Sequence, residues 1–297
     1  MDTRSAFISI VGRTNAGKSS LLNLLLGEKL SIVSDKPQTT RTRITGVFTD
    51  GKDQFVFIDT PGLHKPKTKL SSHMIKAAKS SIGDVDVVIM VADASIGFEE
   101  IELDLIKSIK ETDKPCLLLI NKIDLLKTKE SIMKLLARAG ELHDFDDIIP
   151  VSVKENDGID DVRAAISRYA EEAPHFFPDE LLTDQPEKVL VAEIIREKML
   201  RLLDKEVPHG IAVCIENLSH REDKDIIDIE ANIYCERDSH KGIIIGKGGA
   251  MLKKIGMLSR EDLEDFFGEK VNLKCWVKVK QDWRNKEGSI QNFGFTE

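Results

Sequence analysis

The sequence predicts an α/β protein in which a doubly wound domain is followed by a smaller α+β domain. Three observations lead to this prediction. Short, nearly continuous apolar segments alternate with amphipathic segments over residues 1–172, which is typical of a parallel sheet covered on both faces. A glycine-rich segment, 12–19, joins the first expected strand to the first expected helix. After a proline-containing stretch, the order of the expected elements changes.

The first domain, residues 1–172, is expected to alternate strand and helix. The strands are the segments in which Val, Ile, Leu and Phe run together: Phe7–Val11, Phe55–Ile58, Val87–Val91, Cys116–Ile120 and Ile148–Val151. The clearest helical segments between them are Lys18–Leu26, Glu99–Lys110 and Ile159–Ala170. The segment Val47–Phe55, around Asp50-Gly51, predicts a hairpin and therefore one antiparallel pair in an otherwise parallel sheet.

The second domain, residues 188–297, follows a linker predicted at residues 173–187. Three prolines and the lack of any period make an extended linker the expected structure there. A helix is expected at Val189–Leu203, followed by strands at Ile211–Asn217 and Ile226–Cys235 joined by the turn Leu218–Asp225. A glycine-rich turn, two short helices and a last strand at Val271–Lys280 complete the predicted α+β domain.

Composition places the chain among ordinary soluble globular proteins. Of 297 residues, 41% are hydrophobic and 32% charged, and no apolar run approaches the roughly 20 residues that span a bilayer. Met1–Ser9 shows no signal-peptide pattern, so a cytoplasmic location is expected. The net charge of −8 argues against a general coating of nucleic acid but leaves a local basic surface open. Four widely spaced cysteines, with no CxxC pair, predict reduced core thiols rather than zinc or disulfides.

A complete GxxxxGK[ST] motif lies between the first strand and the first helix, where a phosphate-binding loop requires it. The motif reads Gly12-Arg13-Thr14-Asn15-Ala16-Gly17-Lys18-Ser19. Successive backbone N–H groups and the helix N-terminus favour bound phosphate there. Lys18 is expected to reach the β- and γ-phosphates, and the Ser19 hydroxyl to ligate Mg²⁺.

Two further motifs follow strands in the same way. In Asp59-Thr60-Pro61-Gly62, the carboxylate can hold Mg²⁺ and the Gly62 N–H can approach a γ-phosphate. In Asn121-Lys122-Ile123-Asp124, the Asp can accept from two guanine donors that adenine lacks, while Asn121 bonds the base and Lys122 covers its face. Because α/β sheets bind ligands at the carboxyl ends of their strands, the motifs together predict a GTP or GDP site.

With these motifs in this order, the sequence resembles the translation-factor-related GTPases. The resemblance implies that Gln38-Thr39-Thr40-Arg41 lies in the first switch, where a Thr completes Mg²⁺ coordination; Thr40 is preferred to Thr39. It places Ser152-Val153-Lys154 at the guanine-contacting loop, with Val153 in place of the usual Ala. Lys18, Thr40 and Gly62 are the residues assigned to catalysis, and Ser19, Thr40 and Asp59 the residues assigned to Mg²⁺.

The position after the DTPG motif is Leu63, where Ras-like enzymes have a Gln that orients the attacking water. The chain therefore resembles the GTPases with a hydrophobic residue at the catalytic position. Some of these use K⁺ held by an Asn in the phosphate loop, which Asn15 matches; the alternative is that Asn15 only shapes the loop. His64 beside Leu63 is a candidate base, but a solvated loop histidine near Lys65 and Lys67 is the preferred interpretation.

The second domain carries a GxxG loop between an apolar run and a helix, in Ile245-Gly246-Lys247-Gly248-Gly249. This loop, in this order of elements, predicts a KH-type domain that clamps single-stranded nucleic acid. Basic residues gather nearby although the segment 176–297 is acidic overall. Lys253 follows the loop, and Lys274, Lys278 and Lys280 share one face of the last strand. An RNA-binding surface is predicted from these residues, a solvated strand face being the alternative.

A phosphate-loop GTPase followed by a type II KH domain resembles the Era-like branch of these GTPases over essentially the full chain. Local matches are His175-Phe176-Phe177-Pro178, Glu193–Lys198 and Trp276–Lys280. The resemblance implies a molecular switch that binds near the 3′ end of small-subunit rRNA and acts in 30S assembly. It also implies loose peripheral membrane association. The chain is expected to be a monomer that does not bind DNA, and a KH protein that binds DNA is a further alternative. The alternative is an RNA-binding adaptor whose nucleotide site is mainly structural, an interpretation that Leu63 keeps open.

Overall fold

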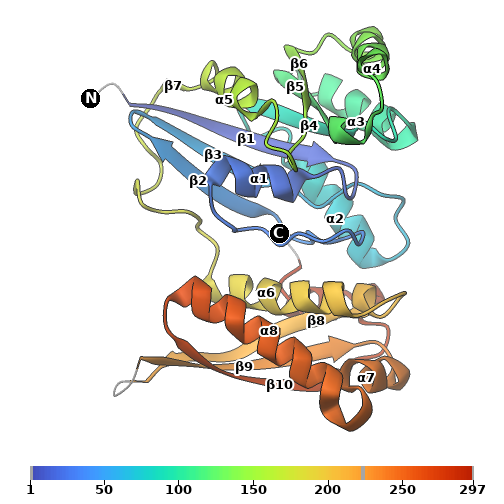
Figure 1. Ribbon diagram of the computed structural model, residues 1–297, viewed down its shortest axis with the longest axis vertical. Coiled ribbons are helices and arrows are strands. Elements are labelled where there is room, and N and C mark those ends of the chain that lie inside the picture. The colour runs from blue at the N-terminus through green and yellow to red at the C-terminus, as the bar shows by residue number, and fades with distance from the viewer. Residues whose placement is uncertain (1–2, 222–224, 296–297) are drawn as a thin grey trace. The chain divides into compact units, whose positions relative to one another are not determined.

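The computed structural model describes residues 3–221 and 225–295 (Figure 1). The chain divides into two compact units, Met1–Lys67 with Ser71–Asp184, and Thr68–Leu70 with Gln185–Glu297. The first is an α/β unit built on a mostly parallel sheet, and the second is an α+β unit with a three-stranded sheet. The predicted fold class is confirmed. The predicted linker, 173–187, spans the end of the first unit and the start of the second.

The sheet of the N-terminal unit has the strand order β2-β3-β1-β4-β5-β6, and β7 pairs with β1 off this path. All pairs between β3 and β6 are parallel, while β2 runs antiparallel to β3. The hairpin expected around Asp50-Gly51 is therefore confirmed. The strands are β1 (Arg4–Gly12), β2 (Ile44–Asp50), β3 (Asp53–Asp59), β4 (Val87–Asp93), β5 (Cys116–Asn121), β6 (Asp147–Val151) and β7 (Glu171–Glu172).

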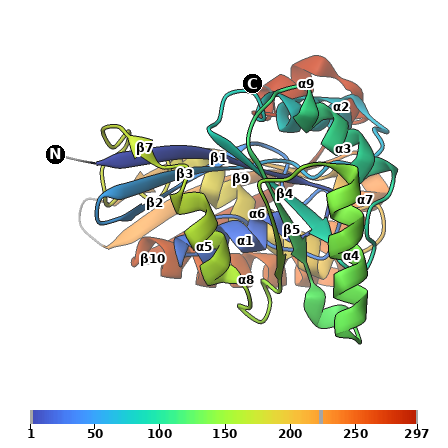
Figure 2. The same cartoon turned by 90° about the horizontal axis from the view of Figure 1, so that it is seen from above.

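Helices cover both faces of this sheet. Viewed from above, α1 and α5 lie on one side of the strands and α2 and α3 on the other (Figure 2). Every residue of β4 and β5 is buried, which explains why these strands read as continuous apolar runs rather than as alternating ones. The helices are α1 (Lys18–Leu26), α2 (Lys69–Ser80), α3 (Glu100–Lys110), α4 (Lys129–Leu142) and α5 (Ile159–Ser167).

Residues 173–184, part of the predicted extended linker, are bonded along the edge of this sheet. The N–H of Val47 in β2 donates to the Leu182 carbonyl at 2.8 Å, and the Thr183 hydroxyl donates to the Thr45 carbonyl at 2.6 Å. The buried Gln54 side chain of β3 accepts from the N–H groups of Phe176 and Phe177. The segment is not extended throughout, because the Leu181 N–H donates to the Pro178 carbonyl in a turn, and its last residues cover the free edge of β2.

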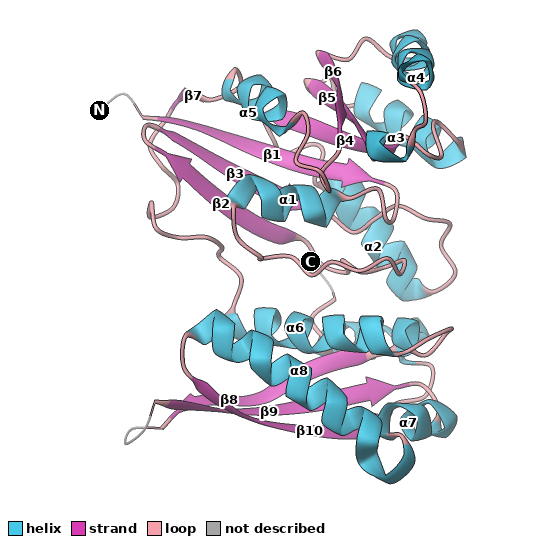
Figure 3. Ribbon diagram, in the orientation of Figure 1, coloured by secondary structure: helices cyan, strands magenta, loops and turns pink. Residues whose placement is uncertain are grey.

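The C-terminal unit packs its helices α6 and α8 on one face of the sheet β10-β9-β8 (Figure 3). Strands β9 and β10 are parallel, and β8 and β9 are antiparallel. Residues 222–224 of the predicted turn Leu218–Asp225 lie outside the described residues. The elements are α6 (Glu187–Leu202), β8 (Ala212–His220), β9 (Ile226–Cys235), α7 (Asp238–Ile245), α8 (Ala250–Phe267), β10 (Lys270–Val279) and α9 (Glu287–Asn292).

Candidate functional site

Four loops that follow β1, β3, β5 and β6 meet at the carboxyl ends of the parallel strands. They contain the predicted GxxxxGKS, DTPG, NKID and SVK motifs. Two neighbouring cavities of about 530 and 630 Å³ share Gly17, Ser20, Val33, Lys122 and Lys154 among their lining residues. The first is lined by the phosphate loop and residues 32–40, and the second reaches Asn121, Asp124 and Val153. The tertiary structure thus joins the predicted phosphate and guanine sites in one groove.

The phosphate loop, Gly12–Ser19, depends on glycine where the backbone is crowded. Gly12 and Gly17 have φ of 153° and 102°. A Cβ on Gly12 would lie 2.3 Å from the Val91 carbonyl oxygen, and one on Gly17 would lie 2.2 Å from Asn121 Nδ2. Any side chain at either position would push the loop away from β4 or from the guanine motif, because real Cβ contacts are not that short.

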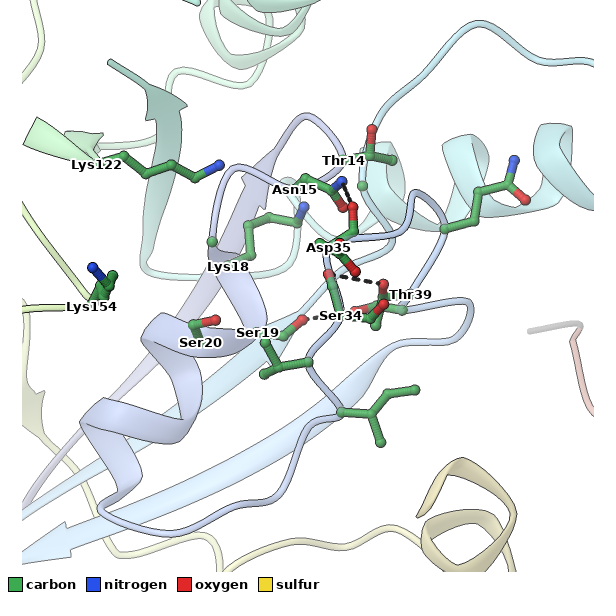
Figure 4. A pocket seen from close by; sticks show the side chains of 16 residues that line it. Thr14, Asn15, Lys18, Ser19, Ser20, Ser34, Asp35, Thr39, Lys122 and Lys154 are labelled. Carbon is green, nitrogen blue, oxygen red and sulfur yellow. Dashed lines mark hydrogen bonds between the residues drawn. The ribbon is translucent and has the colours of Figure 1, made fainter. Parts of the chain in front are cut away.

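Lys18 is folded back onto its own loop. Its Nζ donates to the carbonyls of Gly12 at 3.2 Å and Arg13 at 2.9 Å, and the residue is 5% exposed. Burial lowers its pKa to about 8, against the opposing effect of the Asp59 carboxylate. Figure 4 shows the side chain of Lys18 close to Asn15 in the loop and on the same side of the groove as Ser19. The ammonium is thus held at the phosphate end of the groove.

The residues predicted to hold Mg²⁺ come together around Asp59. Ser19 Oγ donates to Asp59 Oδ2 at 2.7 Å and lies 2.8 Å from Thr40 Oγ1. Asp59 is fully buried; burial raises its pKa, and the charge of Lys18 and the hydroxyl hydrogen bonds oppose that shift. Its Oδ1 is buried with no hydrogen-bond partner among the described residues. A buried, unsatisfied carboxylate oxygen beside two hydroxyls is an all-oxygen donor set, which fits Mg²⁺.

Ser31, which the sequence did not single out, also donates to Asp59 Oδ2, at 3.0 Å. Its position is set by Asn23 of α1. Asn23 Oδ1 accepts from the N–H groups of Leu30 and Ser31, and its Nδ2 donates to the Ser31 carbonyl. A polar residue on the second turn of an apolar helix was the available signal. Asn23 therefore fixes the segment that leads into residues 32–40.

Leu63 is part of the N-terminal core and packs with Val11 and Ile58. Its N–H donates to the Gly12 carbonyl at 3.0 Å, and its own carbonyl accepts from the Thr14 N–H at 3.1 Å. These bonds join the DTPG motif to the phosphate loop. A Cβ on Gly62 would lie 2.6 Å from Thr14 Cα, so this junction also requires glycine.

His64 differs from the solvated histidine that the sequence analysis preferred. Its Nδ1 lies 2.9 Å from the Gly62 carbonyl, which can only accept, and its Nε2 lies 2.9 Å from Gln38 Nε2. The ring therefore donates through Nδ1 and accepts at Nε2 from Gln38. The half-buried imidazole links Gln38 of the predicted first switch to the residues that follow the DTPG motif. The solvated interpretation is wrong because these segments, separate in sequence, meet in space.

Asn15 Nδ2 donates to the Asp35 carbonyl at 2.5 Å, so this residue also contacts the first switch (Figure 4). Its φ is 62°, a left-handed conformation that Asn adopts more readily than most residues. The amide nitrogen is engaged, and the side-chain oxygen is the remaining acceptor. Asn15 therefore links the phosphate loop to Asp35.

The guanine motifs are bonded to one another. Asn121 Nδ2 donates to the Ala16 carbonyl at 2.8 Å, and its Oδ1 accepts from the Val153 N–H at 3.1 Å. Ser152 Oγ donates to Asp124 Oδ1 at 2.7 Å. Asn121 thus connects the phosphate loop to the SVK loop, and Ser152 orients the carboxylate expected to read guanine. Ile123 and Lys154 lie in the same two loops, with Lys154 lining both cavities.

Asp93, at the end of β4, is a site residue that sequence reasoning missed. Its Oδ2 accepts from Lys122 Nζ at 2.6 Å, and its Oδ1 accepts from the Ser95 backbone and hydroxyl. Burial acts to raise the pKa of Asp93, but the bonds from Lys122 and Ser95 hold it below its usual value. A carboxylate directly after a buried strand was the available signal. Asp93 sets the position of the lysine expected to cover the base.

The C-terminal unit has a groove of about 560 Å³ beside its GxxG turn. Gly249, Lys253, Met257 and Arg260 line one side, and Leu273 and Cys275 of β10 line the other. Gly246 has φ of 74°, and a Cβ there would lie 2.8 Å from Met251 Cβ. Lys247 and Gly248 are exposed at the tip of the turn, and Ile245 ends α7 beside it. Gly246 is therefore required by the close packing of the turn on α8, and the tip of the turn is open to solvent.

The other predicted RNA-binding lysines do not line this groove. Residues Leu273 and Cys275 face the groove, so Lys274, Trp276 and Lys278 project from the opposite face of β10. Lys278 Nζ lies 5.9 Å from the Tyr234 ring and Lys280 Nζ 4.9 Å from the Phe293 ring. The residues predicted as one RNA surface therefore form two surfaces that share one edge strand.

Other kinds of site find no support in the described part of the chain. Residues 3–221 and 225–295 contain no group of three or more His, Cys, Asp and Glu side chains able to hold a metal ion. Their helices include none long and apolar enough to cross a membrane. All four cysteines are free thiols.

Comparison with known proteins identifies both units. Residues 7–122 match the family described as 50S ribosome-binding GTPase, and residues 206–284 match the KH domain. The chain is 48% identical over 294 residues to the GTPase Era of Clostridioides difficile (strain 630), covering 99% of each protein. It is also 48% identical to the GTPase Era of Thermoanaerobacter sp. (strain X514), over 99% of this chain and 97% of that protein.

Solved structures agree with this result. A crystal structure of Era in complex with MgGDPNP and nucleotides 1506–1542 of 16S ribosomal RNA superposes with a TM-score of 0.96 at 36% identity, over 99% of this chain and 100% of that one. A variant of Aquifex aeolicus Era bound to GDP·AlF₄⁻ gives the same TM-score, identity and coverage. By sequence and by structure over its whole length, the chain belongs to the Era family of GTPases, enzymes that bind and hydrolyse GTP.

Proposed function

We propose that this GTPase is a molecular switch that binds small-subunit rRNA through its KH domain and acts in assembly of the 30S subunit. The observation that carries the proposal is that one chain holds a complete guanine-nucleotide groove and a GxxG groove built for close approach of a nucleic-acid backbone. The relative solved with MgGDPNP and 16S rRNA nucleotides supports the same pair of ligands here.

In the proposed reaction, water attacks the γ-phosphoryl group of GTP. Lys18 moves its ammonium from the carbonyls of its own loop to the phosphates, because a phosphate oxygen is a stronger acceptor than a peptide carbonyl. The phosphate-loop N–H groups stabilise the charge that develops in the transition state. Ser19, Thr40 and Asp59 are the residues that would hold Mg²⁺, and the bound ion would neutralise charge on the β- and γ-oxygens.

Leu63 cannot orient the attacking water, and it lies in the core. We propose that a monovalent cation held by Asn15 Oδ1 supplies positive charge at the phosphates. Turnover is expected to be faster in K⁺ than in Na⁺ at matched ionic strength, and Asn15→Ala is expected to remove that difference. Equal kcat in the two salts would contradict a role for potassium.

Nucleotide state is proposed to reach the KH domain through the chain that follows Gly62. Residues 68–70, a few positions further on, are grouped with the C-terminal unit. Ordering of residues 62–67 by the γ-phosphate would therefore act along the chain on residues 68–70.

The experiment that tests this function is multiple-turnover GTPase activity in K⁺ buffer, with and without purified small ribosomal subunits. Gly246→Asp places a carboxylate in the GxxG turn and is expected to abolish stimulation by the subunits while sparing basal turnover. Gly140→Asp, at an exposed helical position with open space around the Cβ, is the matched control and should keep the stimulation. Stimulation that is identical in both variants would mean that the RNA partner is a different one.

A second candidate function is an RNA-binding adaptor with a mainly structural nucleotide site. The burial of Leu63 favours it, because no side chain at that position activates water. The variant Lys18→Ala separates the two candidates. If the protein is a switch, the variant should lose phosphate release. If it is an adaptor, its affinity for rRNA should not depend on GTP turnover. We further propose a cytoplasmic monomer with peripheral membrane association and no affinity for DNA, which cell fractionation and competition with single-stranded DNA would test.

A further inference from the structure

The C-terminal sheet exposes a tryptophan that the fold does not use. We call the outer face the side of the sheet opposite α6 and α8, which carries the even-numbered residues of β9 and β10. Val271 and Val277 of β10 belong to the core, so Lys274, Trp276 and Lys278 project from the outer face. Trp276 is 44% exposed in mid-strand. By contrast, Trp283 is fully buried and its Nε1 donates to the Gly210 carbonyl.

Charge on the outer face is unevenly distributed. Asp228 pairs with Arg221 and Glu230 pairs with Lys274 at 3.6 Å, whereas Glu216 accepts from the neutral Asn232 amide, which supplies no counter-charge. Lys278 and Lys280 instead lie over the rings of Tyr234 and Phe293, and neither forms a salt bridge within the described residues. The two lysines without a carboxylate partner, Lys278 and Lys280, therefore lie beside aromatic rings, and the Glu216 carboxylate borders the same part of the face.

We propose that Trp276 stacks on a base of single-stranded RNA that leaves the GxxG groove and crosses β10 onto the outer face, with Lys278 contacting its phosphates. The inference depends on the proposed RNA-binding function and adds a second contact surface to it. An exposed aromatic residue beside lysines is the general means of holding single strands without sequence preference. An apolar protein partner would use the tryptophan but would leave the two lysines without counter-charges.

Continuity with the groove supports an RNA occupant. β10 is an edge strand, and Cys275, which lines the groove, is the residue directly before Trp276. RNA that passes over the edge of the sheet would therefore move from the GxxG groove to the outer face across the width of β10 alone. A GxxG clamp holds about four nucleotides, so any longer single strand must continue beyond the groove.

The test uses an RNA of the 16S nucleotides 1506–1542, the segment bound by the solved relative, with affinity measured by fluorescence anisotropy. Trp276→Ala is expected to weaken binding about tenfold, within the range of one lost base–aromatic stack. Trp276→Phe, which keeps a ring, should stay close to wild type. Phe266→Ala removes a similarly exposed aromatic, 41% exposed on α8, and should change nothing. Lys278→Ala is expected to reduce the slope of log affinity against log salt by about one.

Intrinsic fluorescence provides a second measurement. Because Trp283 is buried, acrylamide quenching of the wild-type protein reports Trp276, and bound RNA is expected to protect it. Wild-type protein that fails to bind the RNA would contradict the proposed function itself. Wild-type binding that Gly246→Asp abolishes and Trp276→Ala leaves unchanged, with no protection from acrylamide, would overturn only the outer-face contact. Protection by a peptide but not by RNA would assign the face to a protein.

Discussion

At the scale of single residues, the phosphate site is a closed network of hydrogen bonds. Lys18 bonds its own loop, and Ser19, Ser31 and Thr40 surround the Asp59 carboxylate. Both charged residues are buried, and desolvation shifts each pKa toward the neutral form. The site therefore binds phosphate by exchanging weak internal partners for strong ionic ones.

The pKa of Lys18 predicts how GTP affinity depends on pH. Below about pH 8 the ammonium is charged before GTP arrives; above it, the free protein loses that proton and must regain it on binding. Affinity for GTP should therefore fall as pH rises through about 8, approaching tenfold per pH unit. Lys18→Arg stays charged throughout and should show no such fall in isothermal titration. Ionisation of guanine is common to GTP and GMP, so GMP, which lacks the phosphates that Lys18 reaches, is the control ligand.

Substitution of Asp93 is expected to lower nucleotide affinity without loss of base selectivity. Asp93→Asn should release Lys122 from its charge-assisted bond and weaken binding of a fluorescent GDP analogue by about three- to tenfold. Preference for guanine over adenine should persist because Asp124 supplies it. Ser95→Ala removes a bond to the same carboxylate but leaves Lys122 held, and it should match wild type. An equal loss in both variants would mean that the β4 turn, and not Lys122, is responsible.

At the scale of elements, the strands themselves were easier to predict than the segments that bond to the edge of the sheet. Strands β4 and β5 are buried on both faces, so their apolar runs alone define them. The helix α4 was not singled out, although Thr128 at its start accepts from the Ser131 N–H as an N-cap. The partners of residues 173–184 depend on β2 and β3, more than 100 positions earlier, and no local pattern contains that information.

Substitution of Gln54 measures how much residues 173–184 stabilise the N-terminal unit. Its buried amide bonds the N–H groups of Phe176 and Phe177 and the Phe177 carbonyl. Gln54→Ala would leave these backbone groups unsatisfied, which is expected to lower the free energy of unfolding by about 3 kcal/mol. Urea unfolding followed by circular dichroism measures this. Gln281→Ala, at an exposed position, is the control, and equal stability of the two variants would show that the segment contributes little.

At the scale of the whole molecule, both tryptophans, Trp276 and Trp283, lie in the C-terminal unit. Their fluorescence therefore reports that unit alone, whereas circular dichroism reports both. GDPNP at about 100 times its Kd should stabilise the N-terminal unit by about 2.7 kcal/mol. Because the proposed switch couples nucleotide state to the KH domain, the tryptophan transition should shift in the same direction by less. A tryptophan transition that does not respond to the nucleotide would contradict this coupling.

The sequence by itself determined the fold class, the two domains and the nucleotide motifs. A phosphate loop is one contiguous segment whose N–H groups converge through local backbone geometry, so its letters are sufficient to identify it. The tertiary structure decided what depends on distant segments: Ser31 and Asp93 at the site, His64 between the switches, and the edge partners of residues 173–184. It also separated Lys274, Lys278 and Lys280 from the GxxG groove. The alternation of a strand shows that these lysines share a face, but only packing against α8 decides which face borders the groove.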